Sequence, residues 1–301
     1  MAEPWHFEKL HFNRGLSMQV ARAGIAPSKP LVVMLHGFPE CWYSWRYQLR
    51  ALAPHFECVA PDLRGYGETD APYGIESYAL DQLVGDVADL IEACGRQRAV
   101  VIAHDWGGAV AWATALKRPE LIERLVVMNC PHLKKFSENL RSNPRQMLKS
   151  WYILFFQIPR LPEALIRARD YAMLSRTLRD SAVQKSAFSD EDLKHYRAAF
   201  RNPYSITAAI NYYRALFRET LRNRSTPSWM NNKITAPTMV IWGEQDVALR
   251  KELTFGMKEL FDAPFEIHYV SDSGHWVQQE KPELVNDYLL KFLSPMMNNA
   301  G

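Results

Sequence analysis

The most informative run in the sequence is Ala99-Val100-Val101-Ile102-Ala103-His104-Asp105-Trp106-Gly107-Gly108. Its first half is continuously apolar, which is typical of a strand buried on both faces. The glycines that follow indicate a turn, and a helix is predicted over residues 107–117. Only Asp105 is charged between residues 99 and 116, but a carboxylate inside a membrane span costs roughly 2.5–3.5 kcal/mol. We therefore predict a buried strand, a sharp turn and a buried helix instead of a membrane span.

On both sides of this run, short strands alternate with helices. Residues 5–12 and 16–23 are predicted to form an antiparallel hairpin around the turn Asn13-Arg14-Gly15. Further strands are predicted at 31–35, 57–60, 99–103, 124–129, 238–242 and 265–270, and further helices at 45–52, 78–94 and 282–292. Strands that alternate with helices form βαβ units. The predicted fold class is therefore α/β, with a mostly parallel sheet and helices on both faces.

The alternation stops between residues 131 and 230, where the sequence reads as helical. This region holds 18 basic and 8 acidic residues, a net charge of +10, which leaves −7 for the rest of a chain whose net charge is +3. We predict an α/β core at residues 1–133 and 231–301, interrupted by a helical cap at 134–230. The basic cap is interpreted as a solvated lid, or as a surface that attracts an anionic ligand or acidic lipid.

The overall composition excludes several classes of protein. The chain has 301 residues, of which 48% are hydrophobic and 23% charged, as in ordinary globular proteins. Its near balance of charge gives no reason to expect nucleic acid. Its four cysteines are far apart and contain no CxxC pair, so neither a zinc site nor a disulfide framework is predicted. With no signal peptide visible at the start, we expect a cytoplasmic protein without a transmembrane segment.

Asp105 lies at the tip of the predicted turn, in the position of a nucleophile. A strand–turn–helix corner projects its central side chain above the carboxyl edge of the sheet. The serine motif G-x-S-x-G does not occur, because no two glycines are four residues apart. The alternative is that Asp105 only caps the helix, since aspartate is a favoured N-cap residue. His36 and His104 flank this corner, and packing roles are expected for them.

Four other positions complete a possible catalytic arrangement. The loop after residues 31–35 can bring the Phe38 amide beside the Trp106 amide, and two such N–H groups would form an oxyanion hole. After the cap, Asp246 follows the strand at 238–242, and His275 follows the strand at 265–270. Nucleophile, acid and histidine thus occur in the chain order of one known family of catalytic triads.

An aspartate nucleophile favours a particular chemistry. Aspartate is ionised at neutral pH and attacks without a base. It suits an sp³ carbon that is strained or carries a good leaving group, so epoxides and alkyl halides both fit. The resulting ester on Asp105 would be hydrolysed by water that His275 activates, with Asp246 orienting the imidazole. This chemistry requires no metal or organic cofactor.

At this point the sequence resembles the epoxide hydrolases of the α/β-hydrolase fold. The resemblance spans most of the chain and rests on His36-Gly37-Phe38-Pro39-Glu40, Asp62-Leu63-Arg64-Gly65-Tyr66-Gly67, His104-Asp105-Trp106-Gly107-Gly108, Asn129-Cys130-Pro131-His132, Gln157-Ile158-Pro159, Asn211-Tyr212-Tyr213-Arg214, Trp242-Gly243-Glu244-Gln245-Asp246 and Gly274-His275-Trp276. It implies that two cap tyrosines, Tyr152 and Tyr213, hold the epoxide oxygen. Tyr212 points about 100° away from Tyr213 on a helix. Ala103 departs from the glycine that the family often has.

Two alternatives stay open. A haloalkane dehalogenase would share the fold and the aspartate, although the dehalogenases compared often have asparagine where Phe38 stands and lack the tyrosine pair. A catalytically silent binding protein would share the scaffold only. The expected partner is a small-molecule epoxide, and the chain is expected to be a monomer or a homodimer. Six aromatic residues are predicted to line the substrate pocket: Phe38, Trp106, Trp151, Phe155, Phe156 and Trp276.

Overall fold

The computed structural model describes residues 3–222 and 226–297. Within them, eight strands form one sheet in the order β1-β2-β4-β3-β5-β6-β7-β8. The strands are β1 (Trp5–His11), β2 (Ser17–Ala23), β3 (Leu31–Leu35), β4 (Glu57–Pro61), β5 (Ala99–His104), β6 (Ile122–Met128), β7 (Thr238–Gly243) and β8 (Phe265–Val270). β1 and β2 form the predicted antiparallel hairpin and β2 is antiparallel to β4, whereas β4, β3, β5, β6, β7 and β8 are parallel neighbours.

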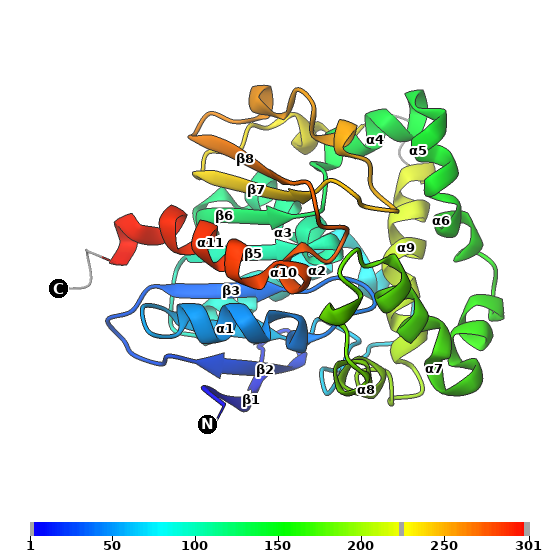
Figure 1. The fold of residues 1–301 in the computed structure, drawn as a ribbon, viewed down its shortest axis with the longest axis horizontal. Coiled ribbons are helices and arrows are strands. Elements are labelled where there is room, and N and C mark those ends of the chain that lie inside the picture. Colours follow the sequence, from blue (N-terminus) through cyan, green and yellow to red (C-terminus); the bar gives the residue numbers. More distant parts are fainter. Residues whose placement is uncertain (1–2, 223–225, 298–301) are drawn as a thin grey trace.

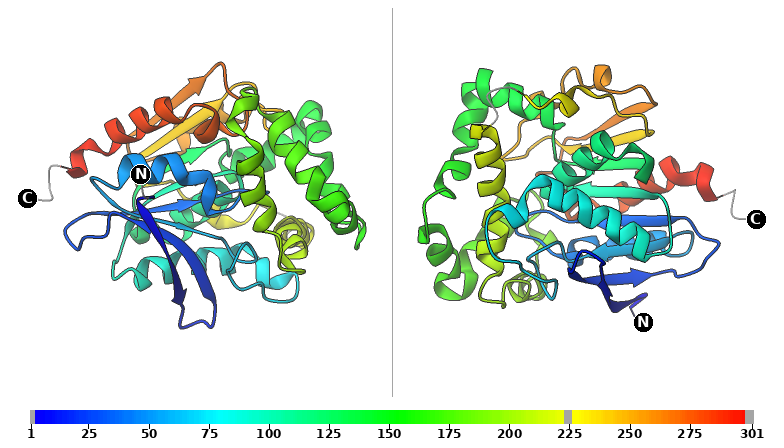
Figure 2. Two further views of the ribbon diagram at one scale, coloured as in Figure 1. Left: turned by 60° about the horizontal axis from the view of Figure 1, so that its bottom comes forward. Right: turned by 180° about the vertical axis from the view of Figure 1, so that it is seen from behind.

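Helices cover both faces of the sheet, as predicted. α1 (Arg46–Leu52), α10 (Val277–Glu280) and α11 (Pro282–Met297) lie on one face, and α2 (Leu80–Ala93) and α3 (Asp105–Lys117) on the other (Figures 1 and 2). Alternate strand residues serve the two layers: in β3, Val32 and Met34 pack with α1 and α11, whereas Val33 and Leu35 pack with α2 and α3. Every residue of β3 is buried, which explains its continuous apolar run.

Between β6 and β7, the described part of the chain contains helices and no strand. These are α4 (Leu133–Ser142), α5 (Pro144–Lys149), α6 (Trp151–Phe155), α7 (Leu161–Ser181), α8 (Asp190–Ala198) and α9 (Ser205–Arg222). We call this helical segment the cap. It lies beside the carboxyl ends of the parallel strands (Figure 1). The exact division at 134 and 230 stays a prediction.

Short 3₁₀ helices complete the chain at Trp42–Trp45, Glu76–Tyr78, Pro119–Leu121, Lys185–Ala187, Ser228–Asn231, Lys251–Thr254 and Met257–Leu260. None of the described helices is long and apolar enough to cross a membrane. The continuous apolar run of residues 99–103 belongs to β5, which lies in the centre of the sheet between β3 and β6.

Candidate active site

Asp105 lies at the sharp corner between β5 and α3. Its φ of 48° is in the left-handed region, which costs about 1–3 kcal/mol for a residue other than glycine and is found mainly at functional sites. The corner is tight because the Gly107 N–H donates to His36 O at 3.0 Å, and a Cβ on Gly107 would lie 2.2 Å from Leu35 O. A Cβ on Gly37 would lie 2.4 Å from Asp105 Cβ. Both glycines are therefore required by close backbone approach.

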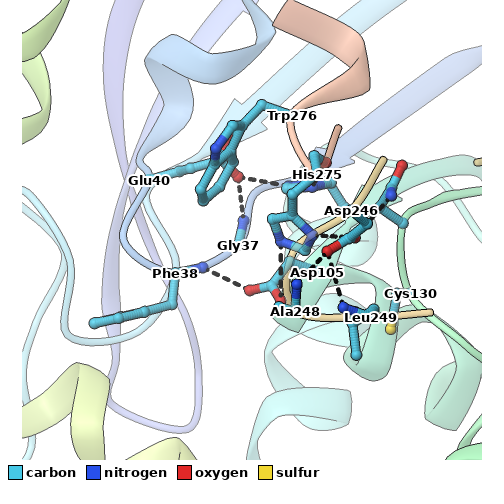
Figure 3. A network of polar contacts seen from close by, with 12 residues as sticks. Gly37, Phe38, Glu40, Asp105, Cys130, Asp246, Ala248, Leu249, His275 and Trp276 are labelled. Atoms are coloured by element: carbon cyan, nitrogen blue, oxygen red, sulfur yellow. Dashed lines mark hydrogen bonds and ion pairs between the residues drawn. The ribbon is translucent and has the colours of Figure 1, made fainter. Parts of the chain in front are cut away.

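The carboxylate of Asp105 points away from its own helix. No side-chain cap is formed at the start of α3, where His104 is the N-cap residue, so Asp105 is not the helix cap. Its Oδ1 accepts a hydrogen bond from Phe38 N at 2.8 Å, and its Oδ2 lies 3.5 Å from His275 Nε2 (Figure 3). The side chain is largely buried, with 18% of its surface exposed. Burial opposes ionisation, but His275, His104 and the Phe38 amide outweigh it and lower the pKa of Asp105.

His275 is held from its far side by Asp246. His275 Nδ1 is 2.6 Å from Asp246 Oδ2, and both side chains are buried (Figure 3). Asp246 Oδ1 also accepts from the backbone N–H groups of Ala248 and Leu249, at 2.7 and 2.8 Å. Burial alone would lower the pKa of His275, but the two carboxylates, Asp246 and Asp105, raise it well above its usual value. The charges of Asp246 and Asp105 therefore favour the protonated form of the imidazole.

Asn129, for which the sequence predicted no role, fixes Asp246 to the sheet. Its side-chain Nδ2 donates to Asp246 Oδ2 at 2.8 Å, and its Oδ1 accepts from Gly243 N at 2.9 Å. Asn129 directly follows β6 and has a φ of 40°, which asparagine tolerates better than most residues. A polar residue directly after a buried strand is the signal that could have identified it.

Glu40 and His104 form a second buried pair behind His275. His104 Nδ1 lies 2.7 Å from Glu40 Oε2, and His104 Nε2 lies 2.8 Å from the backbone oxygen of His275. Both ring nitrogens of His104 therefore have a hydrogen-bond partner. Glu40 also accepts from Gly37 N and from Gln278 and Gln279. Thus Glu40 ties the Phe38 loop and α10 to His104, which supports the backbone of His275.

Two cap tyrosines face Asp105 across an apolar cavity. The cavity has a volume of about 310 Å³, and Asp105, Trp106, Tyr152 and Tyr213 are among the residues that line it. The rings of Tyr152 and Tyr213 have their centroids 5.8 Å apart. Burial, reinforced by the charge of Asp105, raises the pKa of both phenols above the usual value. Both therefore stay protonated at neutral pH and are available as hydrogen-bond donors.

The structure distributes the six predicted pocket aromatics differently. Only Trp106 lines the main cavity. Phe38 and Phe156 are in edge contact with the ring of Tyr213, and so shape the cavity from behind that ring. The remaining three predicted residues, Trp151, Phe155 and Trp276, are not among its lining residues.

Trp151 and Trp276 do not line the cavity, contrary to the prediction. The Trp151 side chain is 62% exposed, because its neighbour Tyr152 already faces the cavity and adjacent helical residues diverge by about 100°. Trp276 is buried and donates its Nε1–H to Ser181 Oγ at 2.8 Å, while its ring packs against His275 and His104. It links the cap to His275 instead of lining the cavity.

Comparison with known proteins agrees with this geometry. Residues 30–282 match the model of the α/β-hydrolase fold family. Human epoxide hydrolase 4 is 38% identical, over 93% of this chain and 76% of its own length. A crystal structure of Bacillus megaterium epoxide hydrolase with an inhibitor superposes with a TM-score of 0.87 at 30% identity, covering 95% of this chain and all of that one. This chain is a member of the epoxide hydrolase family.

One relative of comparable identity is named for the wider α/β-hydrolase superfamily and not for a reaction. The Bacillus subtilis protein YfhM, named only as a member of that superfamily, is 39% identical over 93% of this chain and 95% of its own length. The superpositions include the cap as well as the core, since they cover nearly the whole chain. Among the described residues, no group of three or more His, Cys, Asp or Glu side chains could hold a metal. The family match and the relatives show that the chain is a hydrolase enzyme.

Proposed function

We propose that the chain converts an epoxide and water to a vicinal diol through a covalent ester on Asp105. One observation carries this proposal: a single cavity brings together the Asp105 carboxylate and two protonated phenols, and His275 Nε2 lies 3.5 Å from that carboxylate. A phenol pair suits an epoxide, because the opening ring leaves an alkoxide that needs a proton. A halide leaves as a stable anion and needs no such donor, so the dehalogenase alternative is not favoured.

In the first step, Asp105 Oδ2 attacks an epoxide carbon. A C–O bond to Oδ2 forms, the ring C–O bond breaks, and the ring oxygen takes a proton from Tyr152 or Tyr213. Oδ1 stays bonded to the Phe38 amide and becomes the carbonyl oxygen of the ester. Alkylation removes the negative charge that helps to raise the pKa of His275. The imidazolium then releases its proton, which restores the phenol.

In the second step, neutral His275 accepts a proton from water, whose oxygen attacks the carbonyl carbon of the ester. Negative charge develops on Oδ1, where the Phe38 amide already donates and the Trp106 amide lies in the first turn of α3. First-turn N–H groups have no acceptor within their own helix, which leaves the Trp106 amide free for this oxygen. The acyl C–O bond breaks and the diol leaves with the proton from His275. The carboxyl group of Asp105, one of whose oxygens now derives from water, gives its remaining proton to His275, which restores the starting state.

The known neighbours support an aromatic or otherwise apolar substrate. A variant of the Bacillus megaterium enzyme was solved with its product, 3-[1]naphthyloxy-propane-1,2-diol. In the present chain, the residues that line the cavity beyond Asp105 and the phenols are mainly apolar, among them Leu133, Phe136 and Phe217. We therefore infer that neutral aryl or alkyl epoxides fit better than polar ones.

The test is to trap the ester. Asp105→Ala is expected to abolish turnover of styrene oxide, because burial raises the pKa of Cys130, the other potential nucleophile in the cavity, and keeps it a thiol. His275→Gln should form the ester but fail to activate water, so intact mass spectrometry should show the mass of one epoxide added to the protein. Peptide mapping should place this mass on Asp105.

The control is the double variant Asp105→Asn/His275→Gln, which keeps the shape of the site and should carry no adduct. Absence of an adduct in His275→Gln, despite folding like the parent protein, would contradict the two-step scheme. Release of bromide from 1-bromobutane without diol formation from styrene oxide would instead make the chain a dehalogenase.

A further inference from the structure

The side of the cap that faces away from the sheet exposes an unusual amount of apolar surface. On α5 and α6, Leu148, Trp151 and Leu154 are 76%, 62% and 62% exposed. Their spacing of three residues places them on one side of the α5–α6 path. Ile158, Leu161 and Leu165 are exposed along the following turn and the start of α7. We call these six residues the outer face of the cap; α6 and α7 lie at the edge of the molecule that is away from the sheet (Figure 1).

The opposite side of α5 and α6 is anchored to the core, which fixes the direction of this outer face. Gln146 is buried, and its Nε2 donates to Ala248 O at 3.0 Å and to Ser150 Oγ at 3.1 Å. Tyr152 points into the cavity. The apolar outer side chains therefore cannot turn inward without displacing the residues that position Tyr152. Exposed apolar clusters of this kind mark interaction surfaces.

The substrate cavity is lined by two residues that also reach this surface. Met147 and Leu154 both line the cavity and are both more than half exposed. Apolar surface is thus continuous from the outside of α5–α6 to the cavity that holds Asp105. A path of this kind suits a substrate that is itself apolar.

The charges around the outer face select its partner. Arg145, Arg160, Arg167 and Arg169 are exposed, and none of them has a carboxylate within ion-pair distance among the described residues. The acidic residue between them, Glu163, is buried and bound by Arg214 at 2.6 Å. Because residues 131–230 carry a net charge of +10, two caps facing each other would repel. An anionic lipid surface would attract the same face, and exposed leucine and tryptophan beside arginine are typical of interfacial binding.

We propose that the outer face of the cap docks on an anionic phospholipid surface, from which apolar epoxides enter the cavity between Met147 and Leu154. The docking rests on the exposed side chains alone, whereas the delivery of epoxide rests also on the function proposed above. Contact is peripheral: the leucine and tryptophan side chains enter the headgroup boundary, and the arginines bind lipid phosphates.

The test measures vesicle binding and activity separately. The full chain is floated with phosphatidylcholine vesicles that contain or lack phosphatidylserine, and we expect binding only to the anionic vesicles, with loss at high salt. Leu148→Gln/Trp151→Gln and Arg145→Gln/Arg160→Gln should each weaken binding, the latter by roughly five-fold for each arginine. The matched controls lie on the α/β core. Ile25→Gln/Phe255→Gln replaces two apolar side chains that are about half exposed, and Lys9→Gln/Lys258→Gln removes two positive charges, as the arginine variant does.

Each outcome has a defined meaning. Hydrolysis of styrene oxide in solution should be equal in all variants, whereas hydrolysis of a long-chain epoxide dissolved in anionic vesicles should fall only in the cap variants. Styrene oxide hydrolysis without vesicle binding overturns the docking. Vesicle binding without hydrolysis of any epoxide retains the docking and overturns the proposed function. A dimer in solution that Leu148→Gln/Trp151→Gln dissociates, with no binding to vesicles, would assign the outer face to a second copy of the chain.

Discussion

Tyr212 and Tyr213 are neighbours on α9, yet their phenols serve different purposes. The Tyr212 hydroxyl is buried and donates to Arg64 O at 2.8 Å, which fastens α9 to the loop after β4. The Tyr213 side chain lines the cavity with Tyr152. The difference follows from the 100° between successive helical residues, and the same geometry places Tyr152 inside and Trp151 outside.

This contrast predicts which tyrosine affects the chemistry. In a His275→Gln background, where the ester accumulates, Tyr213→Phe and Tyr152→Phe should each slow ester formation. The double change should slow it by about 10²–10⁴-fold, the usual contribution of a proton donor. Quenched single-turnover mass spectrometry gives the rate.

Tyr212→Phe is the matched control for these changes. It should leave the rate of ester formation unchanged and lower the stability of the fold by about 1 kcal/mol, because one buried hydrogen bond is lost. If the double variant forms the ester as fast as its parent, the two phenols do not donate to the epoxide oxygen.

At the scale of elements, the site is formed by loops that leave the same edge of the sheet. β3, β5, β6, β7 and β8 lead to Phe38, Asp105, Asn129, Asp246 and His275, respectively. The sequence located most of these residues, because long apolar strands and close glycines give strong local signals. It did not locate the bond between Glu40 and His104, which are 64 residues apart, nor that between Asn129 and Asp246, 117 apart. Such bonds depend on tertiary contacts that no local pattern contains.

The buried carboxylate of Glu40 predicts a large effect of a small change. In Glu40→Gln, one amide oxygen would replace two carboxylate oxygens that accept four hydrogen bonds, and the amide N–H₂ group would face other donors. Breaking such a buried charged network lowers the free energy of unfolding by about 3–5 kcal/mol. Urea denaturation of the two proteins measures this difference.

Glu120→Gln is the control for Glu40→Gln. Glu120 pairs with Arg118 on the surface, where an ion pair contributes about 0–1 kcal/mol. Equal losses of stability in the two variants would contradict the role given to Glu40 as the link between the Phe38 loop, His104 and α10.

At the scale of the whole molecule, the cap was the least predictable part. Its helical nature and its charge were evident, but its shape was not. In α7, Arg169, Asp170 and Tyr171 all have positive φ, between 52° and 57°, although no glycine or proline lies at or next to them. This kink is supported by a tertiary contact, because the Tyr171 hydroxyl donates to Phe200 O at 2.8 Å. Local preferences oppose the kink, so only packing against the neighbouring segment could reveal it.

Core and cap together predict a loss of stability in acid. His36, at the end of β3, accepts from Leu63 N at 3.0 Å, and His132, at the start of the cap, accepts from Lys134 N at 3.2 Å. Burial lowers the pKa of each to about 4. Since both pKa values lie below the unfolded value of about 6.5, their stabilisation is present above pH 6.5 and is lost as the pH falls toward 4. The raised pKa of His275 has the opposite sign, and its contribution is already complete below pH 6.5.

Each of the two histidines lowers the free energy of unfolding by up to about 3 kcal/mol between pH 6.5 and pH 4. Burial raises the pKa of Asp62 to about 6, so this carboxyl acts in the opposite direction below pH 6 and offsets about one histidine. We therefore expect a net fall of about the contribution of one histidine. Urea denaturation at stepwise pH measures this slope. His132→Asn keeps an oxygen that can accept from Lys134 N as an N-cap but removes the titrating ring, so it should remove most of the net slope. His55→Asn, at an exposed position, should leave it unchanged. The parent and His132→Asn differ only at residue 132. If the free energy of unfolding depends on pH in the same way in both proteins, His132 does not contribute to the acid sensitivity.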